Sequence, residues 1–423
     1  MAEEALCIEG ARPLRGETGI QGSKNAALPM IAASLLASEG QTVLHRVPPV
    51  KDVLVALEIL RRLGARVDFD PAVGTAVIDT TTVNSTELPP EMGARMRASL
   101  LFVGPLISRF RTATIDEVGG CTIGERGTDY HYRGFARMGA KVEGTPSGGY
   151  VVRAEGLRGA EMYCDVPSHT GTENLVMAAS LSDGESVIVN AASDPEIVDF
   201  GELLARMGAR VEGLGTRRVR ITGVDRLRGA EHTVMHDRLD AGLMLMAAAI
   251  TRGEATLTGV RLDHLEIFEA KLRQMGVELR VRDGARITVS GPERLSPINV
   301  VATFYPGMPT DLQPGLTALA CTAHGDSFIR ETVFENRMGH VKSLRQFGAR
   351  ISPEKDQLVI VHGPSRLKGT RVRASDIRAG AACVLAGLAA EGRTEITNLY
   401  QLDRGHANLE ARLVQLGAGI ERL

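Results

Sequence analysis

The sequence predicts an α/β protein of two domains, each built from three copies of one repeat, with buried helices inside and sheets outside. Two observations support this prediction: a glycine-containing phrase that recurs six times, and an apolar helix in each repeat. A chain of 423 residues has room for two or three domains, because a domain usually holds about 100–200 residues. Six repeats exceed what one core accommodates, since cores stop growing near roughly 250–300 residues. Two domains of three repeats are therefore the simplest arrangement.

The recurring phrase is an apolar residue, a glycine, a small or apolar residue, any residue and another apolar residue, as at 63–67 and 207–211. A segment such as 53–63 precedes each copy, with apolar residues at the three- and four-residue steps of an amphipathic helix. We expect the glycine to end that helix in a left-handed conformation. The six glycines, spaced by 68 to 75 residues, are Gly64, Gly139, Gly208, Gly276, Gly348 and Gly417.

A strand with a polar turn follows each phrase, and then a second helix that is rich in Ala and Leu. These second helices are apolar on most faces, as at 239–250 and 377–390, and a helix of that kind is normally buried. Each repeat therefore contains two helices, two main strands and further short strands. A solenoid is the competing interpretation, but it would need a shorter repeat of about 20–50 residues.

The overall charge and the cysteines limit the functional class. Forty-nine basic and 51 acidic residues give a net charge of −2, so generic binding to nucleic acid or to an acidic membrane has no electrostatic support. We find no secretory signal and no apolar run of the roughly 18 residues that a membrane span needs. Five scattered cysteines without a C-x-x-C spacing argue against a disulfide framework or a zinc site, and favour a reducing, cytoplasmic setting.

Basic residues stand where four of the six buried helices are expected to begin. A positive charge at that end opposes the helix dipole and needs an explanation. Either the helix ends and the side chains together bind a polyanion between the two domains, or each basic residue pairs with a neighbouring carboxylate. Their recurrence at equivalent positions favours the anion site. The four residues are Lys24, Arg97, Arg238 and Arg378.

Two further local patterns are of interest. At the start of the third buried helix, Thr170 and Glu173 have the spacing of a capping box. A loop at 116–126 holds Cys121 and Arg126 among three glycines. Most cytoplasmic cysteines are inert, but an exposed thiol beside arginine can donate a proton or attack. We expect ordinary packing roles for the other cysteines, Cys7, Cys164, Cys321 and Cys383.

Several motifs are characteristic of one family. The segments 23–29, 96–99, 119–124, 306–313, 332–337 and 403–405 resemble those of the UDP-N-acetylglucosamine 1-carboxyvinyltransferase family, the enolpyruvyl transferases that open peptidoglycan precursor synthesis. The resemblance runs from end to end of the chain. The enolpyruvyl transferases of the shikimate pathway share the architecture but lack the cysteine loop.

The resemblance implies an inside-out α/β barrel of two domains, with three βαβαββ units in each. Residues 1–22 and 236–423 would form one domain, and 23–235 the other, which includes the Cys121 loop. It also implies that phosphoenolpyruvate and UDP-N-acetylglucosamine bind in a cleft. The 3′-hydroxyl of the sugar would add to C2 of phosphoenolpyruvate, and loss of phosphate from the tetrahedral ketal would leave an enol ether. No metal, organic cofactor, nucleic acid, membrane or obligate protein partner is implied.

The resemblance assigns roles to individual residues. Cys121 matches the general acid and the expected target of fosfomycin alkylation, and Asp311 matches the candidate base. Lys24 is the third catalytic residue and would hold phosphoenolpyruvate together with Arg126 and Arg404. The other implied substrate-binding residues are Asn25, Arg97, Asp129, His131, Ser168, Thr170, Val333, Arg337, Asp376 and Arg378.

The chain also departs from the family pattern, and the departures lie in stretches that line the nucleotide end of the family's site. The acceptor is therefore less well defined than the donor. A paralogue that acts on another nucleotide or sugar is the alternative function, and a non-catalytic binding relative is a third. The third is disfavoured because the residues that match the family's catalytic positions, Lys24, Cys121, Asp311 and Arg404, are intact. The departures are Val118, Gly127, Tyr130, His169 and Thr170.

Overall fold

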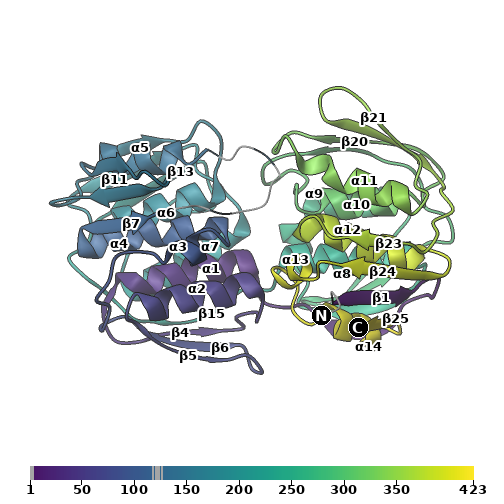
Figure 1. The fold of residues 1–423 in the computed structure, drawn as a ribbon, viewed down its shortest axis with the longest axis horizontal. Helices are drawn as coiled ribbons and strands as arrows, with labels where there is room; N and C mark the ends of the chain where they lie inside the picture. Colours follow the sequence, from purple (N-terminus) through teal and green to yellow (C-terminus); the bar gives the residue numbers. More distant parts are fainter. Residues whose placement is uncertain (1–3, 117–118, 120–123, 125–126) are drawn as a thin grey trace. The chain divides into compact units, whose positions relative to one another are not determined.

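The computed structural model describes residues 4–116, 119, 124 and 127–423. The chain forms two compact units, and each is described by itself. The N/C unit contains Met1–Gln21 and His236–Leu423, and the middle unit contains Gly22–Cys121 and Arg126–Met235. Figure 1 shows both units, coloured along the chain.

The strands of the N/C unit form three four-stranded sheets within the described residues. In chain order they are β1 (Ala5–Glu9), β2 (Arg15–Gly19), β16 (Glu254–Thr258), β17 (Glu278–Asp283), β18 (Arg286–Ser290), β19 (Asn299–Ala302), β20 (Gly325–Glu331), β21 (Ile351–Pro353), β22 (Leu358–Gly363), β23 (Arg371–Arg373), β24 (Arg393–Thr397) and β25 (Gly419–Arg422). The sheet orders are β23-β24-β1-β25, β17-β18-β16-β2 and β19-β20-β22-β21. The N-terminal strands therefore complete two sheets whose other strands come from the last part of the chain, as in the antiparallel pairing of Leu6 with Ile396.

The middle unit repeats this design. Its strands are β3 (Ala37–Glu39), β4 (Thr42–His45), β5 (Arg66–Asp70), β6 (Thr75–Asp79), β7 (Thr112–Ile115), β8 (Lys141–Gly144), β9 (Tyr150–Arg153), β10 (Glu161–Tyr163), β11 (Glu185–Val189), β12 (Arg210–Glu212), β13 (Arg218–Thr222), β14 (Leu227–Arg228) and β15 (Glu231–Thr233). They form sheets β15-β4-β6-β5, β7-β9-β8 and β10-β11-β13-β12, with β14 beside β3. In each four-stranded sheet one outer pair is parallel and the other two pairs are antiparallel, as for β10 and β11 against β13 and β12.

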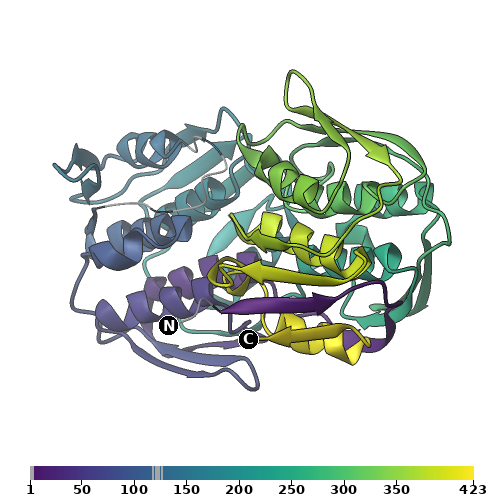
Figure 2. The ribbon, with the colours of Figure 1, turned by 45° about the vertical axis from the view of Figure 1, so that its right-hand side comes forward.

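Three helices form the centre of each unit, and the sheets lie outside them (Figures 1 and 2). Every residue of α8 is buried, and α12 contacts both α8 and α10. This arrangement confirms the predicted interior helices and outer sheets. The order β10, α6, β11, α7, β12, β13 likewise confirms the expected βαβαββ unit. The central helices are α1 (Lys24–Ala33), α4 (Val103–Phe110), α6 (His169–Ala179), α8 (Arg238–Ile250), α10 (Gln313–Ala320) and α12 (Ile377–Ala389).

The amphipathic helices that precede the six glycines are α2 (Lys51–Arg62), α5 (Asp129–Arg137), α7 (Pro195–Met207), α9 (Glu266–Gln274), α11 (His340–Gln346) and α14 (Leu409–Gln415). After them, all six glycines have positive φ angles, from +87° at Gly417 to +103° at Gly208. The predicted left-handed helix ends are thus confirmed. The remaining short helices are η1 (Ser34–Leu36), α3 (Pro90–Gly93), η2 (Arg97–Phe102), η3 (Leu262–His264), η4 (Arg337–Gly339) and α13 (Tyr400–Asp403).

Two local predictions were wrong. The capping box at Thr170 does not form, because Ser168 is the N-cap of α6 and its Oγ accepts a hydrogen bond from the amide of Gly171 at 3.1 Å. Glu173 instead lies beside His169, with 3.2 Å between Oε1 and Nδ1. Arg97 does not begin a buried α-helix, since it begins the 3-10 helix η2 that leads into α4. Among the described helices, none has the length and hydrophobicity required to cross a membrane.

Candidate functional site

Asp311 in the N/C unit is a carboxylate between two arginines. Its Oδ2 lies 3.0 Å from Nε and 2.8 Å from Nη2 of Arg378, and its Oδ1 accepts a hydrogen bond from Nη2 of Arg337. The two arginine side chains are only 8% and 3% exposed, whereas the Asp311 side chain is 27% exposed. Two adjacent cations favour the ionised form of a carboxylate, and an ionised carboxylate is a hydrogen-bond acceptor.

The start of α12 fixes Arg378. Asp376 is the N-cap, and its Oδ1 accepts from the amides of Arg378 at 2.9 Å and Ala379 at 3.0 Å. Burial opposes the charge on Arg378, but the carboxylates of Asp311 and Asp237 raise its pKa above the ordinary value. In this structure Asp376 therefore caps the helix that presents the arginine. The positive charge stays on Arg378 because this end of the helix is rich in carboxylates.

The segment before Arg337 is organised by Glu331, a residue that the sequence did not single out. Its Oε1 accepts from the amide of Val333 at 2.7 Å, and its Oε2 accepts from Oγ1 of Thr310 at 2.8 Å. Burial raises the pKa of Glu331. The amide of Val333 is therefore engaged within the protein. Thr310 is next to Asp311 in the chain, so this contact joins the carboxylate segment to the segment that leads to Arg337.

Arg404 lies at the C-terminal end of α13 and is buried. Its Nη1 donates a hydrogen bond to Oε1 of Gln401 at 3.2 Å. The structure thus gives the N/C unit a buried arginine in addition to Arg337 and Arg378, together with an accessible carboxylate. These are groups that recognise anions and accept a proton, respectively.

Lys24 in the middle unit is the first residue of α1, behind the N-cap Ser23. Its Nζ lies 3.3 Å from Oδ2 of Asp52 in the first turn of α2, and both side chains are buried. Asn25 follows and is half-buried. The ion pairs of Lys24 with Asp52 and of Arg378 with Asp311 confirm the pairing interpretation for these two helix starts. The polyanion role stays a prediction.

The segment around Arg97 contains a second group of predicted residues. Nη2 of Arg97 donates to the carbonyl of Gly127 at 3.1 Å, and burial lowers the pKa of this guanidinium. His131 is fully buried, and its Nδ1 lies 3.0 Å from Nδ2 of Asn174. Burial lowers the pKa of His131 to about 3, so the ring is neutral and offers no exposed surface to a ligand here. Asp129 is exposed and pairs with Arg133 at 3.0 Å.

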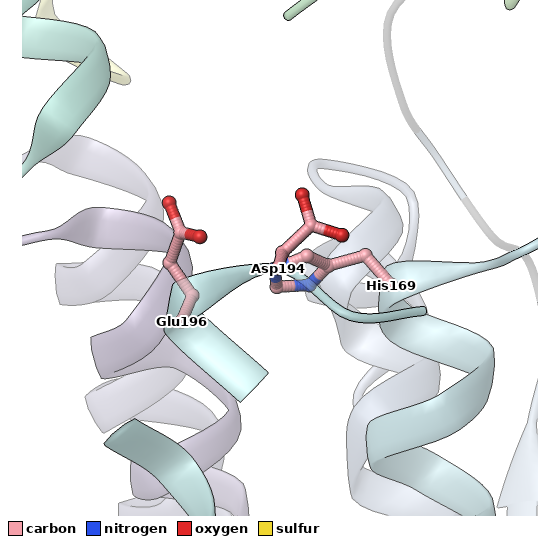
Figure 3. A group of neighbouring side chains, drawn as sticks. All are labelled: His169, Asp194 and Glu196. Carbon is pink, nitrogen blue, oxygen red and sulfur yellow. The ribbon is translucent and has the colours of Figure 1, made fainter. Parts of the chain in front are cut away.

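The start of α6 holds Ser168, His169 and the half-buried Thr170. Besides capping the helix, Ser168 Oγ donates to Oη of Tyr130 at 2.8 Å. His169 lies beside Glu173 and close to Asp194, and Figure 3 shows it with Asp194 and Glu196.

Ligand atoms of His169, Asp194 and Glu196 all lie within 4.8 Å of one another, a geometry that could hold a divalent cation. Burial opposes protonation of His169, but Glu173, Asp194 and Glu196 together raise its pKa to about 10. A protonated imidazole supplies positive charge to these carboxylates itself. We therefore regard the cluster as an internal ion-pair group, and His169 as its cation.

Cys121 and Arg126, and with them Val118, lie outside the described residues. The other four cysteines are buried free thiols, as expected for packing residues. Burial raises the pKa of Cys164 to about 11 and that of Cys321 and Cys383 to about 12, so these thiols stay protonated. Sequence reasoning identified most charged groups of the site, but it missed Asp52, the partner of Lys24, and Glu331, which accepts from Thr310, because spacing along the chain contains no signal for contacts across 28 and 21 residues.

Each unit is an inside-out barrel, and this chain of two such units contains buried cations and an accessible carboxylate. The family model of EPSP synthase (3-phosphoshikimate 1-carboxyvinyltransferase) matches residues 8–413. The chain belongs to this family of carboxyvinyltransferases. The enolpyruvyl transferase NikO from Streptomyces tendae is similar in structure, with a TM-score of 0.90, 27% identity and coverage of 100% of this chain and 99% of that one. An EPSP synthase from Acinetobacter baumannii has a TM-score of 0.77 at 20% identity, with full coverage of both chains, which shows the fold alone.

Within the family, the chain is similar to proteins of one name. UDP-N-acetylglucosamine 1-carboxyvinyltransferase from Thermobifida fusca (strain YX) is 47% identical over 421 residues, which cover 98% of this chain and 97% of the relative. UDP-N-acetylglucosamine 1-carboxyvinyltransferase 1 from Halalkalibacterium halodurans is 44% identical, with coverage of 99% and 94%. These identities are well above the 27% found for NikO.

Proposed function

We propose that this protein is an enzyme that transfers the enolpyruvyl group of phosphoenolpyruvate to the 3′-hydroxyl of UDP-N-acetylglucosamine and releases phosphate. The observation that supports this best is the 42–47% identity, over nearly the whole chain, to relatives that bear the corresponding name. The reaction is the first committed step of peptidoglycan precursor synthesis. We propose a cytoplasmic location, which the four free thiols among the described residues support.

The chemistry requires proton transfers in both of its steps and strong recognition of anions. In the addition step, the sugar oxygen forms a bond to C2 of phosphoenolpyruvate, its proton passes to Asp311, and C3 receives a proton from the thiol of Cys121. In the elimination step, C3 returns a proton to the thiolate of Cys121, the C2–C3 double bond forms again, and the C2–O bond to phosphate breaks, so that phosphate leaves with the electron pair of that bond and takes up the proton held by Asp311. A carboxylate held by two guanidinium groups has a defined position for its part in this sequence.

We assign the remaining residues to the two substrates. Lys24, Arg126 and Arg404 would bind the phosphate and carboxylate of phosphoenolpyruvate, where fixed cations stabilise the charge of the ketal. Arg337 and Arg378 would support the same step through Asp311. For the acceptor, the proposed residues are Asn25, Arg97, Asp129, Ser168, Thr170, Val333 and Asp376. His131 is not among them, because its side chain is fully buried.

An assay of phosphate release tests the proposal. We expect release only when phosphoenolpyruvate and UDP-N-acetylglucosamine are both present, with an enolpyruvyl ether as the product in mass spectrometry. Release that occurs with UMP or a free sugar, but not with UDP-N-acetylglucosamine, would instead identify the paralogous function. Absence of release with every acceptor, from protein that is folded by circular dichroism, would reject catalysis.

The acid role of Cys121 has its own test. We expect Cys121→Ser to lose nearly all turnover, because a serine hydroxyl is a far weaker acid than a thiol. Cys121→Asp is expected to keep activity, since a carboxylic acid can deliver the same proton. Fosfomycin should label Cys121 alone in peptide mapping, whereas labelling of the buried Cys164 or Cys321 would contradict the assignment.

A further inference from the structure

Arg404 is followed by a short segment without regular secondary structure, between the end of α13 at Asp403 and the start of α14 at Leu409. Gln21 attaches to this segment on both sides of His406. Its side-chain Nε2 donates to the carbonyl of Gly405 at 2.9 Å, and its Oε1 accepts from the amide of Ala407 at 2.8 Å. One amide side chain therefore fixes two peptide groups of the segment that contains Arg404.

A buried ion pair supports the same segment from another side. Asp240, the third residue of α8, is fully buried and accepts hydrogen bonds from both terminal nitrogens of Arg412 in α14, at 2.9 Å for Nη2 to Oδ1. The Asp240–Arg412 pair makes two further contacts, one with Gln21 and one with the segment that follows Arg404. Asp240 Oδ2 accepts from the backbone amide of Gln21 at 3.4 Å, and Arg412 Nε donates to the carbonyl of Ala407 at 3.2 Å.

His406 lies on Asp240, with 3.5 Å between Nδ1 and Oδ1, and both side chains are 1% exposed. Burial lowers the pKa of His406, so the ring is neutral at neutral pH. Although burial alone would raise the pKa of Asp240, Arg412 and His406 together hold it well below its usual range. Asp240 therefore stays charged and keeps its contacts. We call Gln21, Asp240, His406 and Arg412 the Gln21 network.

The same segment also packs closely on α12. A Cβ atom at Gly405 would lie 2.7 Å from Cγ2 of Ile377, which is the first residue of α12 and directly precedes Arg378. Position 405, next to Arg404, therefore has no room for a side chain unless Ile377 moves. The segment is held by backbone contacts from Gln21 and Arg412 and by tight packing at Gly405, and each of these constraints acts within three residues of Arg404.

We propose that the Gln21 network positions Arg404 for binding phosphoenolpyruvate, an inference that rests on the function proposed above. None of the four residues is assigned to the substrates. They act through Arg404, because fixing the peptide groups at 405 and 407 fixes the backbone from which its guanidinium extends. A rigid backbone reduces the entropy that the arginine loses when it binds an anion.

The test is the variant Gln21→Ala, which removes both amide contacts and leaves the buried charges in place. We expect the KM for phosphoenolpyruvate to rise about tenfold, with the KM for UDP-N-acetylglucosamine changed less than about twofold and kcat less than about threefold. Hydrogen exchange should become faster at residues 404–408 in the same variant. Asp240→Asn should give the same pattern, more strongly.

The matched control is Ser327→Ala, which removes a buried hydrogen bond from the amide of Ile298 at 3.1 Å in another sheet of the N/C unit. It should lower thermal stability without changing either KM. If Gln21→Ala leaves the KM for phosphoenolpyruvate or the exchange at 404–408 as in the wild type, the inference is overturned. Wild-type protein that releases no phosphate would reject the proposed function itself, a result independent of the Gln21→Ala comparison.

Discussion

Asp311 shows how a single carboxylate can be both a structural counter-ion and a reactive group. We predict that Asp311→Asn lowers kcat at least about 100-fold, because the amide cannot accept the proton of the sugar hydroxyl. Stability should also fall by about 3–5 kcal/mol, since Arg337 and Arg378 would be buried without their anion. Steady-state kinetics and chemical denaturation measure the two effects.

The control for this variant is Asp263→Asn in the same unit. Asp263 pairs with Arg261 at 2.5 Å on the surface, where an ion pair contributes little. Kinetics and stability should both stay near wild-type values. Full turnover in Asp311→Asn would remove Asp311 from the proton-transfer step, whatever its effect on stability.

His169 permits a prediction of how stability varies with pH. Its pKa is raised to about 10 in the folded protein, against an ordinary value of 6.5, so the folded state binds the proton more tightly than the unfolded state. The stabilisation is therefore fully present below about pH 6.5 and is lost as the pH rises toward 10, by at most about 1.4 kcal/mol per pH unit.

We expect the stability of the wild type to fall relative to His169→Gln as the pH rises over this range, measured by urea denaturation at several pH values. The difference between the two proteins reports the titration of His169 together with that of the carboxylates coupled to it, chiefly Glu173, because groups elsewhere are common to both. Parallel stability curves for the two proteins would show that the ring is neutral in the folded state.

The six amphipathic helices end by one shared device, a left-handed glycine. At Gly417 φ is +87°, and a Cβ atom would meet nothing within 4 Å, so backbone strain alone determines the cost of a side chain. We predict that Gly417→Ala destabilises the protein by about 1 kcal/mol. Gly417→Asn should cost less, because asparagine tolerates this conformation better. Equal stability of the alanine variant and the wild type in urea denaturation would contradict the argument.

The glycine period predicted both the repeats and the helix ends, because a helix C-terminus is a local event that depends on neighbouring residues. The start of α6 shows the limit of such reasoning. Thr170 and Glu173 have capping-box spacing, yet Ser168 is the N-cap and Glu173 pairs with His169. Both alternatives are local, and the difference between them depends on the burial of Glu173 in the core, which spacing does not reveal.

Contacts between residues far apart in the chain could not be predicted from the sequence, for a different reason. Lys24 stood out by its position, but its partner Asp52 lies 28 residues away on another helix. Gln21 belongs to no motif, and it meets Gly405 across 384 residues of chain. Such pairs depend on which distant strands join the same sheet. The N-terminal strands β1 and β2 complete two sheets of the N/C unit, and the repeat pattern does not predict that pairing.

At the level of the whole molecule, the two units differ in which segments of the chain complete their sheets. The N/C unit needs two separate segments, because β1 and β2 complete sheets built from the last part of the chain. The described strands and helices of the middle unit all come from the segment 22–235, and the two ends of this segment meet: β15 pairs in parallel with β4, and β14 with β3. Its three central helices and its sheets are supplied from within this segment.

We therefore predict that residues 22–235 fold without the rest of the chain. Native strand pairing at both ends and a complete set of central helices provide a core of their own, in a segment of ordinary domain size. Circular dichroism and cooperative urea unfolding should show a folded fragment. The matched control, residues 22–226, lacks β14 and β15 and leaves the edges of β3 and β4 unpaired, so it should unfold at lower urea concentration. If 22–235 shows no cooperative transition, closure by β14 and β15 is insufficient, and the folding of the middle unit depends on the N/C unit.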